Sequence, residues 1–177
     1  MRLLYALTLY VLLPGRLLAQ IPSYTEADTT LASIKAFIPV SDRMATSAQI
    51  AVGHIKAIKE AGYQVIINLA PANDKVNRDE GFAAVSAELI YVQIPVDFKN
   101  PQLSDLNFFF QILEATINRK VFVHCFANMR ASSFMYLYRV LKEGVPETEA
   151  WKAVEQVWTP NEVWAAFIKR AIAVNGR

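Results

Sequence analysis

Apolar residues along this chain follow two spacings, one typical of buried strands and the other typical of helices. Short apolar runs rich in β-branched residues predict buried strands at Tyr63–Leu69, Leu89–Ile94 and Lys120–His124. Helical spacing predicts helices at Gln49–Ala61, Asp79–Ala87, Ser104–Ile117 and Met129–Glu143. Strands that alternate with helices lie parallel, with helices on both faces of the sheet. We therefore expect an α/β domain of three layers, in which helices flank a small, largely parallel sheet.

Smaller signals mark the ends of these elements and predict three more elements. Gly62 and Gly144 follow two of the predicted helices and are typical C-caps. Short β-prone pieces lie upstream, at Ala36–Val40 and near Arg43–Thr46. The segment Thr159-Pro160-Asn161-Glu162 predicts another helix, with Thr159 as its cap and Pro160 as its first residue.

The first residues have the pattern of a leader peptide. Arg2 precedes a short apolar run from Leu3 to Leu13, and Ala19 offers a cleavage site. Because the run is too short to span a bilayer comfortably, we expect residues 1–19 to be a signal peptide, with a retained anchor as the alternative. The mature protein would then be periplasmic or secreted, without stable membrane insertion. Residues 20–35 are predicted to be an N-terminal arm and residues 36–177 a single domain, for which a hydrophobic content of 54% is ample.

The charge balance does not favour nucleic acid as a partner. The chain carries 18 basic and 16 acidic residues, and loss of Arg2 and Arg16 with the leader would make the numbers equal. No basic surface is implied by such a composition, so we expect no nucleic-acid partner.

The chain contains a single cysteine, Cys125. Exported proteins normally use cysteine in disulfides, so a lone thiol is either buried and inert or kept for its reactivity. Its neighbours favour reactivity, since it lies in Val121-Phe-Val-His-Cys-Phe-Ala-Asn-Met-Arg130, between a predicted strand and a predicted helix. Ligands of open α/β sheets bind at such junctions, at the carboxyl ends of the strands.

The loop that follows Cys125 has the chemistry of an anion site. The N-terminus of a helix presents unpaired backbone N–H groups and a positive dipole end, which bind an oxyanion and stabilise a thiolate. Arg130 adds a planar cation suited to phosphate oxygens, and Asn128 tolerates the left-handed backbone that a tight loop requires. We predict Cys125 as the nucleophile. The predicted anion-binding residues are Phe126, Ala127, Asn128, Met129 and Arg130.

This segment resembles the signature of the cysteine-based protein tyrosine and dual-specificity phosphatases, in which His-Cys, five residues and Arg are followed by Ser or Thr. The similarity extends to Ala45–Gln49, Ala61–Leu69 and Ile94–Asp97, which resemble bacterial dual-specificity-phosphatase-like domains in their order, and it covers roughly residues 37–167. The resemblance implies a cysteine-phosphatase-like fold. It also implies hydrolysis of a phosphorylated small molecule or phosphoprotein through a cysteinyl-phosphate. His124, which precedes the cysteine, is a candidate to tune the pKa of the thiol or to hold the loop, and a partly buried histidine paired with the backbone is the alternative.

The loop departs from that signature in its length. Only four residues separate Cys125 from Arg130, a spacing that resembles the rhodanese sulfurtransferases, and Ala131 stands where the phosphatases have Ser or Thr. Two alternatives therefore stay open, a persulfide carrier of the sulfurtransferase type and an inactive module that binds phosphate or another anion. Ser132 and Ser133 are candidates for the hydroxyl that assists the departing thiolate, or they are ordinary helix residues.

Phosphoryl transfer to a cysteine also requires a proton donor for the leaving oxygen. Asp97 follows the predicted strand Leu89–Ile94, where the resembling phosphatases carry their general acid, and we predict that role for it; a simple turn residue is the alternative. Asp105 is a weaker candidate, because an acid in the first turn of a helix is expected for dipole reasons. The two histidines, His54 and His124, lie far apart without a cluster of ligands, so we expect neither metal nor cofactor.

Overall fold

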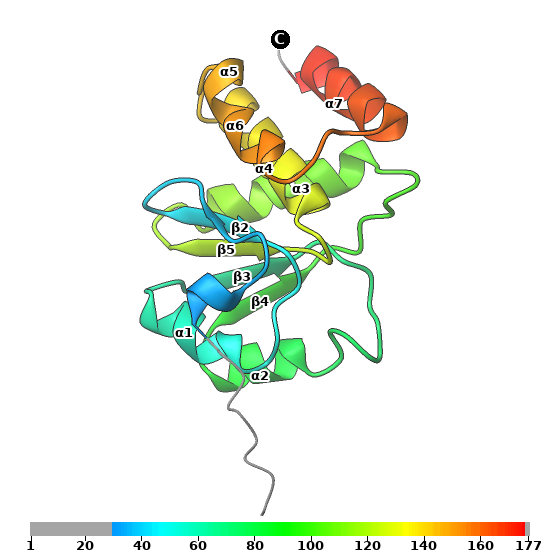
Figure 1. Cartoon of the computed structure of the whole chain (residues 1–177). Helices are drawn as coiled ribbons and strands as arrows, with labels where there is room; N and C mark the ends of the chain where they lie inside the picture. The colour runs from blue at the N-terminus through cyan, green and yellow to red at the C-terminus, as the bar shows by residue number, and fades with distance from the viewer. Residues whose placement is uncertain (1–29, 176–177) are drawn as a thin grey trace, which may run out of the picture.

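The computed structural model describes residues 30–175 of the chain. The predicted signal peptide and most of the predicted arm lie outside these residues. From residue 30 onward the chain forms a short turn of 3-10 helix, η1 (Leu31–Ser33), and Ile34 is already buried. Within the described part, a five-stranded sheet has helices on both of its faces (Figure 1), so the predicted α/β class is confirmed.

The central strand of the sheet is the one that leads to Cys125. The strands are β1 (Ile38–Pro39), β2 (Met44–Ser47), β3 (Val65–Asn68), β4 (Ile90–Gln93) and β5 (Val121–His124), in the spatial order β1-β2-β5-β3-β4. β1 pairs antiparallel with β2, and the other neighbours pair in parallel. Ser47, His124 and Asn68 lie in register at the ends of β2, β5 and β3. The residue after His124 therefore lies in the middle of the carboxyl edge of the sheet.

Two layers of helices cover the sheet (Figure 1). α1 (His54–Glu60), α2 (Glu80–Ser86) and η1 lie on one face, and α3 (Leu103–Ala115) and α4 (Met129–Leu141) lie on the other. The chain ends with α5 (Glu147–Ala150), α6 (Lys152–Glu155) and α7 (Glu162–Asn175), which pack on α4. No helix within residues 30–175 is long and apolar enough to span a membrane.

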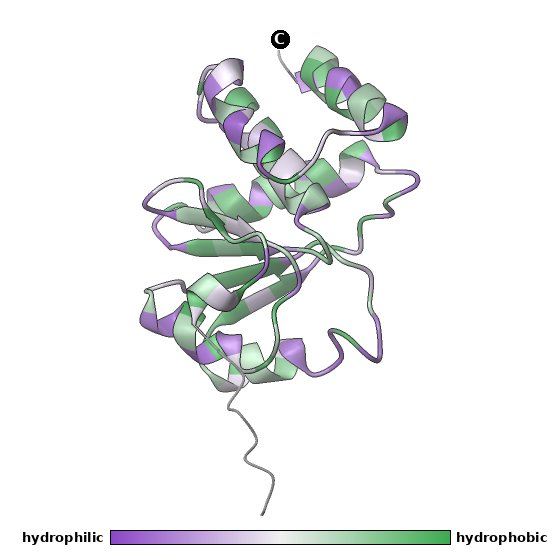
Figure 2. Ribbon diagram, viewed as in Figure 1, coloured by the Kyte–Doolittle hydropathy of each residue, from purple (hydrophilic) through white to green (hydrophobic). Residues whose placement is uncertain are grey.

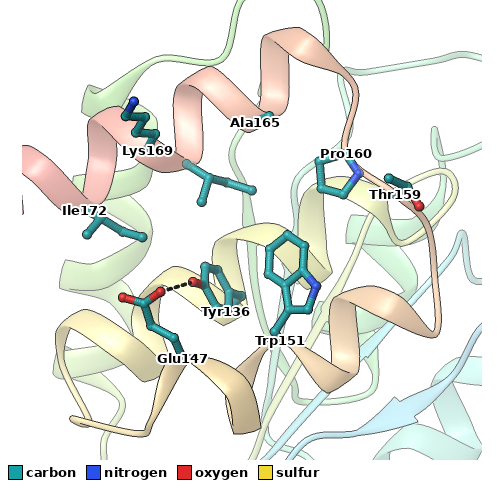
Figure 3. A pocket seen from close by; sticks show the side chains of 9 residues that line it. Tyr136, Glu147, Trp151, Thr159, Pro160, Ala165, Lys169 and Ile172 are labelled. Carbon is teal, nitrogen blue, oxygen red and sulfur yellow. Dashed lines mark hydrogen bonds between the residues drawn. The ribbon is translucent and has the colours of Figure 1, made fainter.

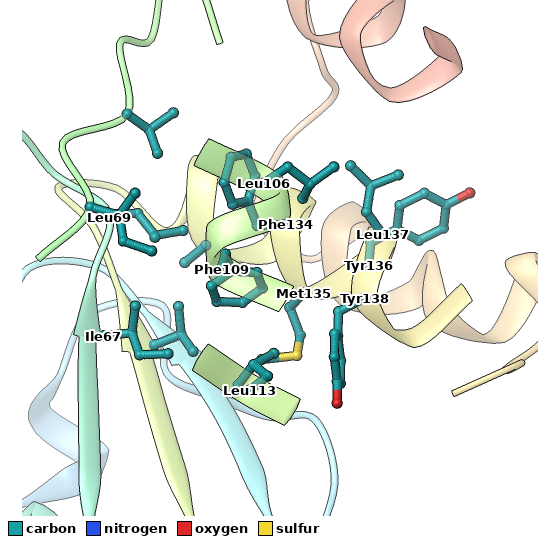
Figure 4. Packing of buried hydrophobic residues seen from close by; sticks show 14 of the residues in the cluster. Ile67, Leu69, Leu106, Phe109, Leu113, Phe134, Met135, Tyr136, Leu137 and Tyr138 are labelled. Carbon is teal, nitrogen blue, oxygen red and sulfur yellow. The ribbon is translucent and has the colours of Figure 1, made fainter. Parts of the chain in front are cut away.

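The strands are the most hydrophobic part of the ribbon (Figure 2), and they separate two buried clusters. Neighbouring side chains of a strand point to opposite faces. Val121 and Val123 therefore belong to the cluster shared with α3 and α4, where Figure 4 shows Phe109 on the side that faces Ile67 of β3, whereas Phe122 packs with α1 and η1. Both faces of β5 are thus covered, which explains its continuous apolar run.

Two predicted elements differ from the structure. The predicted buried strand at Leu89–Ile94 is β4, an edge strand whose Ile90 is 41% exposed, because a largely apolar run also suits an edge strand covered on one face. The helix predicted from Gln49 begins only at His54. Ile50 is buried in the same cluster as Ile55 and Ile58 of α1, and this shared burial gave it the apolar character of a helix position. In the structure it reaches that cluster from a loop.

The cap of α7 also differs from the prediction. Asn161, and not Thr159, caps the helix, since its Oδ1 accepts the backbone N–H of Trp164 at 3.0 Å. The first backbone bond of the helix runs from Ala165 N–H to Asn161 O at 2.8 Å. Pro160 therefore precedes the cap and does not begin the helix.

We predict that Asn161→Ala lowers the free energy of unfolding by about 1 kcal/mol, because the Trp164 amide loses its acceptor. Thr159→Ala is the matched control, with an expected change within about 0.5 kcal/mol, as for an exposed position away from such features. Urea denaturation followed by circular dichroism measures both. A larger loss for Thr159→Ala than for Asn161→Ala would contradict the assignment of the cap.

Candidate active site

Cys125 lies directly after β5 with its side chain 1% exposed, among residues that face α3 and α4. Its backbone N–H donates to Ser47 O at 3.3 Å, and the preceding carbonyl, of His124, accepts Leu69 N–H at 2.8 Å. The end of β5 is therefore held from both neighbouring strands. These bonds fix the position of the thiol at the carboxyl edge of the sheet.

Asn128 makes the turn from β5 into α4 possible. Its φ is 63°, in the left-handed region, as its residue type led us to expect. Its side-chain Nδ2 donates to Ala36 O at 2.8 Å and to Thr46 Oγ1 at 3.2 Å. The loop is thus bonded to β2 and to the segment that precedes β1.

The first turn of α4 presents amide groups that the helix does not use. Ser132 N–H donates the first intrahelical bond, to Asn128 O at 2.8 Å, and no side chain caps this end of the helix. The amides of Met129, Arg130 and Ala131 precede that bond, and the dipole of a 13-residue helix adds partial positive charge. Ala127 is exposed and Met129 half-buried, so the loop backbone is partly accessible. Such a helix end can bind an anion.

Arg130 is a buried cation with an unused donor. Its side chain is 7% exposed, Nη1 donates to Leu69 O at 3.1 Å, and Nε has no hydrogen-bond partner among the described residues. Its guanidinium lies 5.4 Å from the ring centre of Phe126 and 5.7 Å from that of Phe98. Burial lowers the pKa of Arg130, whereas the charges of Cys125 and Asp97 act to raise it. A bound anion would compensate both the buried charge and the free N–H group.

Asp97 lies in the exposed loop between β4 and α3, close enough for its charge to act on Arg130. Its Oδ1 accepts Lys99 N–H at 2.9 Å, a turn contact that leaves Oδ2 outside the bond. Asp105 is in the first turn of α3, where burial raises its pKa. Of these two carboxylates, Asp97 is the one whose charge acts on Arg130.

The two candidate hydroxyls differ in their surroundings. Both serines are fully buried in α4. Ser132 Oγ donates to Met129 O at 3.2 Å, a bond within its own helix. Ser133 Oγ has no partner among the described residues. Of the two hydroxyls, that of Ser133 is therefore the one without a hydrogen-bond partner in the described part of the chain.

His124 is fully buried and pairs with a carboxylate that the sequence did not suggest. Its Nε2 lies 2.7 Å from Glu80 Oε1, and Glu80 is only 2% exposed. The same carboxylate accepts bonds from Tyr91, Asn68 and Gln49. Burial, and then the charge of Glu80, raise the pKa of Tyr91. A polar network therefore underlies the residue next to Cys125, on the face covered by α1 and α2.

Glu80 was missed because it has the sequence features of a surface residue. It follows Asp79 at the start of a helix, where acids are expected for dipole reasons. The available signal was Gly81, since a glycine inside a helix often marks a close packing contact. A Cβ at position 81 would lie 3.1 Å from the ring of Tyr91, so the glycine allows α2 to approach β4 closely.

Two further observations concern other possible binding sites. A pocket of about 450 Å³ lies between α4, α5 and α7 (Figure 3), where Tyr136 donates to Glu147 beside Trp151, and none of its lining residues belongs to the cysteine loop. Within residues 30–175 no cluster of His, Cys, Asp and Glu is arranged to hold a metal ion.

We predict that Glu80→Gln lowers the free energy of unfolding by about 1–3 kcal/mol, because one amide N–H₂ group would face donors where an oxygen now accepts them. Asp79→Asn is the matched control, at the exposed residue that precedes the same helix and makes no side-chain cap bond, and should change stability by less than about 0.5 kcal/mol. Denaturant unfolding measures both. Equal stability of Glu80→Gln and the wild type would contradict the network.

No family model and no curated protein match the chain, whereas solved structures do. The DUF442 candidate phosphatase of Shewanella putrefaciens CN-32 has a TM-score of 0.75 and 30% identity, over 83% of this chain and 97% of that one. P. aeruginosa TpbA has a TM-score of 0.64 and 13% identity, over 82% and 93% of the two chains. Tk-PTP has a TM-score of 0.63 and 15% identity, over 77% and 95%. At these lower identities, the last two show the fold alone.

Proposed function

This chain belongs to the DUF442 family, and on that premise we propose that it is an exported, cysteine-dependent phosphatase that hydrolyses phosphomonoesters. The observation that carries the proposal is the loop of Cys125, which combines a thiol, the open amide groups of α4 and the unused Nε of Arg130. A phosphoryl group carries three oxygens that accept such donors. The substrate would be a phosphorylated small molecule or a phosphoprotein.

The first step is attack of the Cys125 thiolate on phosphorus. A sulfur–phosphorus bond forms and the bond from phosphorus to the ester oxygen breaks. The leaving oxygen takes its electron pair and a proton from the carboxylic acid of Asp97. Arg130 and the N-terminus of α4 stabilise the negative charge of the equatorial oxygens during this transfer.

The second step is hydrolysis of the cysteinyl-phosphate. Asp97, now a carboxylate, accepts a proton from water while the water oxygen attacks phosphorus. The sulfur–phosphorus bond breaks, inorganic phosphate leaves and the Cys125 thiolate is restored. Ser133 is the hydroxyl that would stabilise this departing thiolate, because its Oγ has no other partner in the described structure.

The spacing of four residues between Cys125 and Arg130 favours one competing reaction. In it, the thiolate attacks the outer sulfur of thiosulfate, a cysteine persulfide forms, and sulfite leaves with the electron pair of the broken sulfur–sulfur bond. Asp97 would have no role there. If neither reaction occurs, the same loop would act as a module that binds phosphate.

We predict that the mature protein releases phosphate from an aryl phosphate and that Cys125→Ser lowers kcat by about a thousandfold or more. Asp79→Asn, a change at the exposed residue that precedes α2, is the control and should keep wild-type turnover. The same preparations are incubated with thiosulfate, and their masses are measured by mass spectrometry. Sulfur loading of Cys125 without phosphate release would reject the phosphatase in favour of the transferase. Phosphate binding without either reaction would leave a binding module.

The role of Asp97 gives a separate prediction. Asp97→Asn should lower kcat for an aryl phosphate by about a hundredfold, the usual size of a lost general acid, and should flatten the pH dependence of kcat. Asp105→Asn is the control, because the charge of Asp105 is not among those acting on Arg130. A larger loss in Asp105→Asn than in Asp97→Asn would transfer the acid role to Asp105.

A further inference from the structure

The loop that carries Asp97 is bonded to the last helix of the chain. Trp164 of α7 is completely buried, and its indole Nε1–H donates to the backbone carbonyl of Phe98 at 2.9 Å. At the other end of the same loop, Arg170 Nη2 donates to Pro101 O at 3.3 Å. One helix thus holds both ends of the segment that begins at Asp97.

Phe98 connects this helix with the anion site. Its ring centre lies 5.6 Å from that of Trp164 and 5.7 Å from that of Trp158. The guanidinium of Arg130 lies 5.7 Å from the same ring. Phe98 therefore contacts the C-terminal aromatic cluster and the cation of the loop at the same time.

The indole N–H of Trp164 does more than fill the core. A buried Trp donor needs an acceptor, and this one uses the carbonyl of the residue after Asp97. That carbonyl shares its peptide plane with the N–H of Lys99, which donates to Asp97 Oδ1 at 2.9 Å, so fixing the carbonyl also fixes the donor that orients the Asp97 carboxylate. A proton donor must lie within hydrogen-bond reach of the leaving oxygen, so small displacements of the loop weaken it.

We propose that Trp164 is a positioning residue, which acts through Phe98 to hold Asp97 beside Arg130. The inference rests on the phosphatase proposed above and assigns to α7 a role in its reaction. In the proposed reaction, α7 contributes no group that touches the substrate. Its contribution is the geometry of the loop between β4 and α3.

The test uses two aryl phosphates that differ in their need for a proton donor. Phenyl phosphate has a poor leaving group, whereas the leaving group of 2,4-dinitrophenyl phosphate departs without help. Trp164→Phe removes the N–H group and keeps an aromatic ring. We expect kcat/KM on phenyl phosphate to fall about tenfold and kcat/KM on the dinitrophenyl ester to fall less than about twofold, because kcat/KM reports the first step, in which only the phenyl ester needs the acid.

Trp151→Phe is the matched control, because Trp151 lies outside the loop and its ring centre is 5.1 Å from that of Tyr136. It should leave the ratio of the two kcat/KM values unchanged. If Trp164→Phe fails to fold, Phe98→Leu decides, since Phe98 is half-buried on the loop. It should lower the ratio in the same direction and also raise KM for both esters, because Arg130 loses its aromatic neighbour.

Equal losses of rate on the two esters, or wild-type rates of Trp164→Phe on both, would overturn the positioning role. Either result would leave the proposed phosphatase activity intact. An unchanged ratio in Phe98→Leu would do the same. A wild-type protein without activity on either ester would reject the proposed function, and the inference would fall with it. The wild-type measurement therefore separates the two failures.

Discussion

Asn128 turns the chain from β5 into α4 with a φ of 63°, while its side chain donates to Ala36 O and Thr46 Oγ1. The cysteine loop depends on this turn, because it brings the first amides of α4 back to the end of β5. A residue with a branched side chain would be strained there. Since one of its acceptors precedes β1, the support of the loop begins near the first described residues of the fold.

Successive side chains at the end of β5 point to opposite faces of the sheet, which separates the buried polar network from the thiol. His124 points toward α1 and α2, where it pairs with Glu80, and Cys125 is packed with the residues facing α3 and α4. The buried polar network thus stabilises the end of the strand without occupying the side of the thiol. On that side, Arg130 is the buried charge, and its Nε has no hydrogen-bond partner among the described residues. The phosphate of the proposed reaction would compensate this charge.

The features that the sequence predicted are local ones. Strand runs, the single cysteine and the left-handed Asn128 each depend on a few neighbouring residues, so their patterns could be interpreted directly. Glu80 and Trp164 depend on contacts across the fold, from α2 to β5 and from α7 to the loop after β4. Gly81 indicates a close packing contact beside Glu80 but does not identify the partner of Glu80, and no residue near Trp164 identifies its partner. The same reason explains β4, whose exposed side follows from its place at the sheet edge.

The central claim is that Cys125 becomes phosphorylated during turnover. The direct measurement is mass spectrometry of the protein after brief reaction with an aryl phosphate and an acid quench, followed by digestion. We predict that the peptide containing Cys125 gains the mass of one phosphoryl group, and that Cys125→Ser gains none. Phosphate release by a protein whose Cys125 peptide stays unmodified at every reaction time would contradict the account.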